Sequence, residues 1–291
     1  MATENSRPKP AEDIFARISD ELAKGTVPWH KAWVVRPECI LSYDRGKPYS
    51  LRNRMLLSFA GEYATFNQIK KLGGSVNKGA KGKWVYFSKE VKRKKEDPDE
   101  KDSFYHLLKA YCVFNICDTN LEPKWPEKWS GDKAPDCNAM QVVRDYCERT
   151  GVIIHEAGAS AFYSPSSDEL QVPNINTFES EVEFYSVLFH EVAHSTGKRL
   201  GRQYGVSMLG MADDKYCREE LVAEITAALC LGHLDLDTED TVINSTAYIS
   251  SWQKNLSQMK PTEFGDACYQ AQRAFNLIFN INEINKETTN D

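Results

Sequence analysis

The segment Phe189-His190-Glu191-Val192-Ala193-His194 restricts this chain more than any other stretch, because it reads His-Glu-x-x-His inside an apolar run. Side chains four residues apart share one face of an α-helix, so His190 and His194 point at one spot. Two imidazole nitrogens there can bind a metal ion at about 2.0–2.1 Å. Glu191 is rotated by about 100° and can reach a metal-held water as a general base. The alternative is two hydrogen-bonded histidines on a surface helix.

A second helical pattern follows and offers a third ligand. Glu220 and Glu224 are four residues apart and share a face of this helix, which we expect to end at Gly232. A site with two histidines and one glutamate leaves a fourth position for water. We therefore predict Glu220 as the ligand and Glu224 as the hydrogen-bond partner of a ligand histidine, with Glu219 as the competing ligand. Exposed glutamates near a helix start are the alternative for all three. The expected cofactor is one Zn²⁺ per chain, with another divalent metal left open.

The flanking residues place both ends of the metal-binding helix and the elements around it. Ser180 and Glu183 fit a capping box at its start, and we expect Gly197 to stop it. A helix over 138–150, closed by glycine, and a hairpin formed by 159–163 and 170–173 precede it. Further helices are expected around 247–256 and 267–278.

Charge divides the chain into two unlike halves. Residues 1–129 carry 24 Lys+Arg and 17 Asp+Glu, a net charge of +7, whereas residues 130–291 carry 12 and 25, a net charge of −13. Such a split suggests that the first half meets a polyanion and the second does not. The 8 cysteines are scattered without a Cys-x-x-Cys pair, as in reduced thiols of a cytoplasmic protein. No apolar run is long enough for a membrane helix, so we expect no membrane partner.

The first half reads as a small α+β unit. We expect helices over 12–24, 52–59 and 65–72, and strands over 83–87 and 111–116. The mixed charge run 92–102 between these strands is best explained as a solvated hairpin tip, and a role in nucleic-acid binding is the less favoured alternative. A stretch rich in proline over 126–138 is the expected linker, which gives domains at 1–125 and 139–291.

Basic and aromatic residues are interleaved in this first half. Single-strand binders combine a positive groove with aromatic side chains on which bases stack. The alternative is that the aromatic residues are core and the cations a solvated face. The residues expected to bind nucleic acid are Arg45, Lys47, Arg52, Arg54, Lys78, Lys81, Lys83, Trp29, Trp84 and Tyr86.

Nearly the full chain resembles a known family, the ArdC-type antirestriction proteins, and the related N-terminal region of TraC-type plasmid primases. In the first half the resemblance is carried by Pro28-Trp29-His30-Lys31-Ala32-Trp33, Gly46-Lys47-Pro48-Tyr49 and Gly73-Gly74-Ser75-Val76-Asn77-Lys78-Gly79. In the second half it is carried by 161–165, 168–173, His190 through Gly197, and Tyr216 through Glu224.

The resemblance implies a two-domain α+β protein, with a basic domain that binds single-stranded DNA followed by a zincin-like metallopeptidase domain. It also implies a protein of mobile elements that shields incoming DNA from host restriction, with a host restriction protein or another protein as peptide substrate. Two alternatives stay open: a DNA-binding shield whose metal site is structural or vestigial, and a peptidase that regulates host factors. For the group that would stabilise a developing oxyanion, the sequence offers Tyr163, Tyr216 and His233 without choosing among them.

Overall fold

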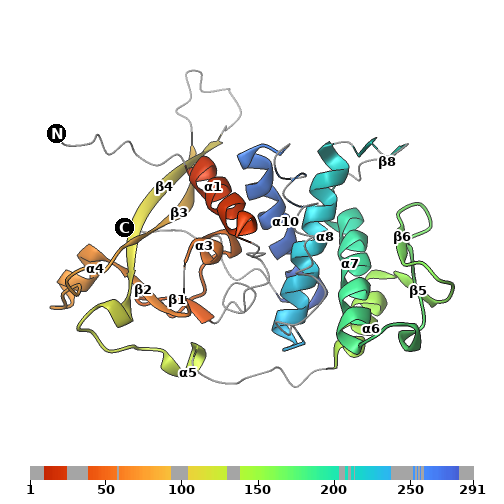
Figure 1. Ribbon diagram of the computed structural model, residues 1–291, viewed down its shortest axis with the longest axis horizontal. Helices are drawn as coiled ribbons and strands as arrows, with labels where there is room; N and C mark the ends of the chain where they lie inside the picture. Colours follow the sequence, from red (N-terminus) through yellow and green to blue (C-terminus); the bar gives the residue numbers. More distant parts are fainter. Residues whose placement is uncertain are drawn as a thin grey trace.

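The computed structural model describes residues 10–24, 39–57, 59–92, 104–129, 138–202, 207–208, 211–212, 214–236, 252, 254, 256 and 259–281. In the first half, the described strands form one sheet in the order β1-β2-β4-β3 (Figure 1). β1 pairs in parallel with β2, whereas β2 and β3 each pair antiparallel with β4. The strands span Ile40–Ser42 (β1), Gly61–Thr65 (β2), Lys83–Lys92 (β3) and Phe104–Asn115 (β4).

β3 and β4 form the predicted hairpin and extend well beyond the predicted strands. Their register runs from the pair Lys83–Val113 to the pair Lys92–Phe104, so residues 93–103 connect them and lie outside the described residues. The predicted helix at 65–72 is confirmed as α4 (Phe66–Lys71), and Thr65 and Gln68 form its capping box. Two more helices, α1 (Pro10–Ala23) and α3 (Leu51–Leu56), confirm the patterns at 12–24 and 52–59.

The second half is mainly helical. Its sheet has the order β5-β7-β6, in which β6 and β7 form the predicted hairpin and β5 adds in parallel, a strand that the sequence pattern missed. The helices are α6 (Ala139–Thr150), α7 (Glu181–Leu200), α8 (Asp214–His233) and α10 (Pro261–Ile278); the strands are β5 (Ile153–Glu156), β6 (Phe162–Ser164) and β7 (Glu169–Val172). Shorter elements are α5 (Pro126–Trp129), β8 (Ser207–Met208), β9 (Met211–Ala212) and two 3-10 turns, Ile116–Asp118 and Ile175–Thr177.

The helix α7, which carries the two histidines, begins where predicted but ends later. Ser180 is the N-cap, and its hydroxyl accepts a hydrogen bond from the Glu183 backbone N–H. The expected stop at Gly197 is wrong, because Gly197 is a buried helical residue whose carbonyl accepts the closing bonds. Gly201, at φ 70°, ends the helix instead, since a glycine terminates a helix when it adopts the left-handed conformation.

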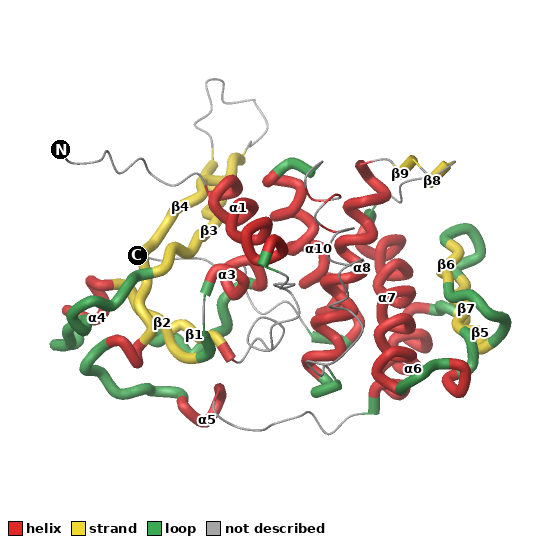
Figure 2. The backbone as a smooth tube through the Cα atoms, in the orientation of Figure 1, coloured by secondary structure: helices red, strands yellow, loops and turns green. Residues whose placement is uncertain are grey.

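One hydrophobic core joins the two halves of the chain. It contains Ile18 and Leu22 of α1 and Leu56 of α3 together with Phe264 and Phe275 of α10. α10 therefore contacts α1 and α3 on one side and α7 and α8 on the other. Figure 2 shows the sheet of β1 to β4 and the sheet of β5 to β7 at opposite ends of the molecule with helices between them. The predicted domain limits stay a prediction, but the halves are packed together and are not merely tethered.

None of the helices in the described part of the chain is long and apolar enough to cross a membrane.

Candidate metal centre

α7 brings the two histidines together, because they are one turn apart on it. Their Nε2 atoms lie 3.1 Å apart. The apolar residues next to the histidines in the chain are fully buried, namely Phe189, Val192 and Ala193. This packing fixes the rotation of α7, so that the histidine face is held toward α8, which packs against it.

α8 presents Glu220 to the same point. Its carboxylate oxygens lie 3.4 Å from His190 Nε2 and 3.6 Å from His194 Nε2. Ligand atoms at about 2.0–2.2 Å from a tetrahedral ion are about 3.3–3.6 Å apart, so the spacing fits a small divalent cation. Among the described residues, His190, His194 and Glu220 form the cluster that could hold a metal. The donor set, two imidazoles and a carboxylate, is also one that zinc accepts.

The two neighbouring glutamates lie on the outer side of the histidines. Glu219 Oε1 is 3.4 Å from His194 Nδ1, the nitrogen that faces away from Glu220. This position disfavours Glu219 as the competing ligand and makes it the partner of a ligand histidine instead. Glu224 Oε1 is 3.9 Å from His190 Nδ1, beyond the length of a direct hydrogen bond. The sequence pattern predicted Glu224 as the partner of a histidine and Glu219 as the competing ligand, because side-chain direction within a helical turn depends on the packing of the two helices and is not visible in the sequence.

Electrostatics at the site favour a proton on His190 when no cation is bound. Burial lowers the pKa of His190, but the carboxylates of Glu220, Glu224 and Glu191 outweigh it and raise that pKa to about 9. Glu219 shows the opposite balance. Burial raises its pKa, yet hydrogen bonds with His194 and Arg202 prevail and leave it below its usual value.

Glu191 is electrostatically coupled to both histidines and to Glu220. Burial raises the pKa of its carboxyl group, and the neighbouring histidines oppose that rise. The carboxylate also accepts a hydrogen bond from the backbone N–H of Tyr163. Tyr163 belongs to β6, an edge strand of its sheet, so the outer edge of this strand lies beside the metal centre.

The three candidates for oxyanion stabilisation have different surroundings. The Tyr163 hydroxyl donates to Asp168 Oδ1 at 2.7 Å. The Tyr216 side chain is hydrogen-bonded to Glu220, which places it at the metal centre. His233 is 13 positions beyond Glu220 on α8, about 20 Å along the helix axis, and packs edge-on against Phe275 and Phe279. Of the three, only Tyr216 is held at the site by its side chain.

The residues expected to bind nucleic acid are dispersed. Arg45, Lys47, Lys78 and Lys81 are exposed, Lys83 is half-buried, and Trp84 is 37% exposed. Trp29 lies outside the described residues.

Two of these assignments are corrected and a third is weakened. Tyr86 and Arg54 are each 1% exposed, so neither can meet a nucleic acid. Tyr86 belongs to the shared core, and Arg54 donates to the Tyr49 carbonyl at 3.2 Å. Arg52 is half-buried near Gly265 of α10, at the contact between the two halves.

Sequence reasoning also missed an exposed aromatic residue of the first half, Phe66. Phe66, at the first position of α4, is 52% exposed. Trp84 pairs with Cys112, while Thr65, the residue before Phe66, pairs with Val113. Lys83, the residue before Trp84, pairs with the same Val113, so Thr65 and Lys83 lie about two strand spacings, or roughly 10 Å, apart. Only the exposure, which the sequence does not show, distinguishes Phe66 from a core phenylalanine.

Family comparisons divide the chain at the same place as its charge. Residues 8–114 match the N-terminal domain of anti-restriction factor ArdC. Residues 141–268 match a zincin-like metallopeptidase.

Solved structures with a similar fold cover nearly the whole chain. The Mn(II)-bound crystal structure of the antirestriction protein ArdC from plasmid R388 has a TM-score of 0.68 and 27% identity, over 92% of this chain and 96% of that one. The metal-free crystal structure of the same protein has a TM-score of 0.67 and 26% identity, over 93% and 97%.

Curated relatives extend the likeness to other bacterial proteins. The protein y4eC of Sinorhizobium fredii is 26% identical over 87% of this chain and 88% of its own length. A DNA primase TraC of Escherichia coli is 28% identical over 94% of this chain, which spans 20% of the primase. A second Escherichia coli TraC is 27% identical over 96% of this chain, which spans 28% of it.

Proposed function

The chain has the two-domain organisation of the ArdC-type antirestriction proteins, and on that premise we propose that it binds single-stranded DNA and hydrolyses a peptide bond at a metal centre. The peptidase half of the proposal is carried by one observation: three ligand atoms at the spacing of a divalent cation, with the half-buried carboxylate of Glu191 electrostatically coupled to them. We assign His190, His194 and Glu220 as ligands of one Zn²⁺. The Mn(II) of the R388 protein makes manganese the alternative.

The residues around the centre have separable roles in this mechanism. A bound divalent cation supplies Lewis-acid polarisation of a carbonyl and makes water more acidic. Glu191 accepts the proton of the attacking water, and its raised pKa brings it closer to the working pH of a general base. The Tyr163 backbone N–H holds the Glu191 carboxylate in place. Tyr216, hydrogen-bonded to Glu220, is our candidate for stabilising the oxyanion.

The substrate of this reaction is an extended peptide in our proposal. β6 is an edge strand, and its backbone beside Glu191 offers a template to which a peptide can add as a further strand. A host restriction protein or another host protein supplies that segment. Phe162 and Ser164 are the neighbours of Tyr163 in β6, and Phe162 is 46% exposed.

Peptide hydrolysis is tested with Glu191→Gln, which removes the base and keeps the size of the side chain. The metal-loaded parent and the variant are incubated with host lysate, and new peptide N-termini are mapped by mass spectrometry. We expect cleavage by the parent alone, with equal metal content in the two proteins. Equal cleavage by both would exclude this mechanism. Cleavage by neither would favour a DNA-binding shield with a structural metal site.

The DNA half of the proposal is supported by the net charge of +7 over residues 1–129 and by exposed aromatic residues within it. Phosphates would meet the exposed cations Arg45, Lys47, Lys78 and Lys81, and bases would stack on Trp84 and Phe66. The relation to TraC, whose name is that of a DNA primase, agrees with a nucleic-acid partner.

DNA binding is tested by fluorescence anisotropy of the full-length protein with a labelled single strand at several salt concentrations. Replacing Lys78 and Lys81 by Ala should lower affinity and flatten the salt dependence, because fewer counterions are released. Replacing Trp84 or Phe66 by Ala should lower affinity by about 1–3 kcal/mol with little change of slope. Replacing the exposed Lys215 and Lys254 removes equal charge from the acidic half and is the control. No binding by the parent at low salt would refute this half.

A further inference from the structure

The imidazole of His194 is held from both of its nitrogens. Nε2 faces the other two ligand atoms, and Nδ1 lies 3.4 Å from Glu219 Oε1. A histidine that donates its second N–H to a carboxylate keeps the proton there and leaves the first nitrogen free for a metal. The Glu219 carboxylate therefore selects the tautomer that binding requires.

Arg202 in turn holds the Glu219 carboxylate. Its Nε donates to Oε2 at 2.9 Å and its Nη2 to Oε1 at 2.8 Å, a bidentate pair. Both side chains are only 6% exposed, so water screens this pair weakly. The carboxylate cannot turn away from His194 without breaking both bonds.

The guanidinium is also anchored to the metal-binding helix. Nη2 donates to the Ala193 carbonyl and Nη1 to the Thr196 hydroxyl, both at 2.8 Å. Ala193 directly precedes His194 in the chain. Arg202 thus connects α7, next to one ligand histidine, with α8, which carries Glu219 and the ligand Glu220. Lysine could not replace it, since an ammonium group lacks the planar fork that reaches all four acceptors.

We propose that Arg202 and Glu219 are positioning residues of the metal centre: Arg202 fixes the Glu219 carboxylate, and Glu219 fixes the ring of His194 so that Nε2 faces the metal. The inference rests on the proposed function in one respect, that the centre binds a divalent cation. It adds residues that contact neither metal nor substrate and act through His194.

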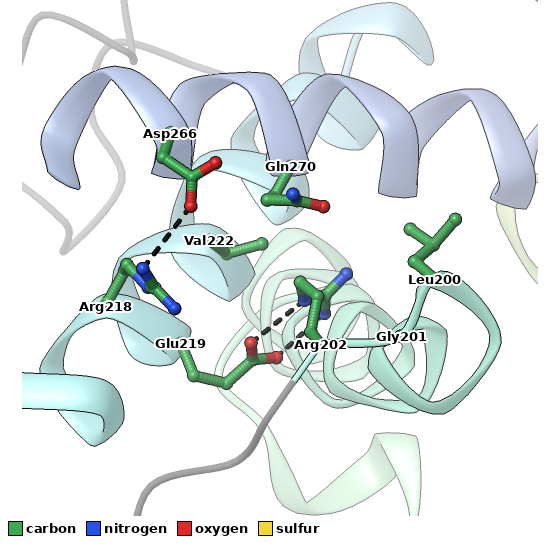
Figure 3. A pocket seen from close by; sticks show the side chains of 8 residues that line it. All are labelled: Leu200, Gly201, Arg202, Arg218, Glu219, Val222, Asp266 and Gln270. Atoms are coloured by element: carbon green, nitrogen blue, oxygen red, sulfur yellow. Dashed lines mark hydrogen bonds and ion pairs between the residues drawn. The ribbon is translucent and has the colours of Figure 1, made fainter. Parts of the chain in front are cut away.

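A pocket beside this pair makes a sharp test available. It has a volume of about 230 Å³ and is lined by Arg202, Glu219, Arg218 and Asp266, among others. Figure 3 shows Arg202 directed at Glu219, while Arg218 pairs with Asp266 across the pocket, at 3.5 Å. Truncating Arg202 would add its vacated space to this pocket, so a small guanidinium ion could enter and contact Glu219. Arg218 is a matched control, because it lines the same pocket without a contact to the carboxylate of Glu219 among those drawn.

The experiment measures the dissociation constants of Zn²⁺ and Mn²⁺ by chelator competition, with the full-length parent, Arg202→Ala, Arg202→Lys, Glu219→Gln and Arg218→Ala. We expect affinity to fall about 10- to 100-fold in Arg202→Ala and Glu219→Gln, to fall less in Arg202→Lys, and to stay unchanged in Arg218→Ala. Millimolar methylguanidinium should restore metal affinity in Arg202→Ala and have no effect on Glu219→Gln. Circular dichroism verifies that each variant is folded. If Arg202→Ala does not fold, Arg202→Lys takes its place in the comparison of metal affinities.

The outcomes separate this inference from the function on which it rests. A parent that binds metal, with folded Glu219→Gln and Arg202 variants that bind it equally well, would overturn the positioning role alone. Equal weakening in Arg218→Ala, or no recovery with methylguanidinium, would show a general packing effect and would also overturn it. A parent that binds no divalent metal would overturn both the inference and the proposed metal centre.

Discussion

If His190 is a metal ligand as proposed, protons and the metal ion compete for it, and this competition makes metal binding depend on pH. The three carboxylates that raise the pKa of His190 to about 9 also attract a cation, so binding at neutral pH must displace a proton. Since the protonated form dominates below that pKa, apparent affinity should rise about tenfold per pH unit between roughly pH 6 and 8. Calorimetry in buffers of different ionisation enthalpy counts the protons released. Metal binding at pH 7 without proton release would contradict the expectation.

Asp168 connects the β6–β7 hairpin to the end of α7. Its carboxylate accepts hydrogen bonds from Arg199 at 3.0 Å, Lys198 at 3.1 Å and the Tyr163 hydroxyl at 2.7 Å. The Arg199 guanidinium contributes most to holding the pKa of Asp168 well below its usual range, against a smaller opposing effect of burial. Because Asp168 has φ 60°, asparagine, which tolerates this conformation, is the substitution that removes charge alone.

Asp168→Asn should therefore lower the free energy of unfolding at pH 7 by about 1–2 kcal/mol. A depressed carboxyl pKa stabilises the fold above the unfolded value of about 3.9, and that stabilisation is lost as pH falls toward the folded pKa. Urea unfolding at pH 7 and at successively lower pH measures the difference between parent and variant. A difference that persists unchanged well below pH 3 would show that charge is not its source.

At the scale of elements, the sequence predicted most helices and the hairpins β3–β4 and β6–β7, because caps and periodicity are local signals. Ser180, Thr65 and Asn138 are N-caps as their residue types suggest. The end of α7 was misplaced because glycine tolerates a helix interior, and only the backbone angle at Gly201 shows which glycine terminates it. The sequence predicted Glu224 as the partner of a histidine, whereas Glu219 is the closer of the two, since these contacts depend on how α8 packs against α7.

The left-handed conformation of Gly201 at the end of α7 leads to a prediction about the stability of the protein. At φ 70° a Cβ meets nothing within 4 Å, so Gly201→Ala tests the backbone conformation alone. We expect the free energy of unfolding to fall by about 1 kcal/mol, and by less for Gly201→Asn, because asparagine adopts the left-handed conformation more readily. Thermal unfolding of the two variants measures both values. An equal loss in the two would point to a cause other than backbone strain.

At the scale of the whole molecule, the sequence shows how charge is divided between the two halves, but it does not show how the halves pack against each other. The halves of opposite net charge share one hydrophobic core, to which α1, α3 and α10 contribute. Local patterns showed that each of these helices has an apolar face, but a pattern cannot specify which distant helix covers that face. The consequence is that a ligand in one half should stabilise the other.

This consequence yields the last prediction. Because α10 packs against both the first-half helices and the pair α7 and α8, the protein should unfold in a single transition, seen equally by probes in either half. A divalent cation at about 100 times its dissociation constant should raise the unfolding free energy by about 2.7 kcal/mol and shift that one transition upward by several degrees. Leu22→Ala, which opens a cavity on the first-half side of the shared core, should lower the free energy of unfolding by about 2–5 kcal/mol. Scanning calorimetry with and without metal tests both shifts. Two separate transitions, with only the one from the second half responding to metal, would show that the halves fold independently despite their common core.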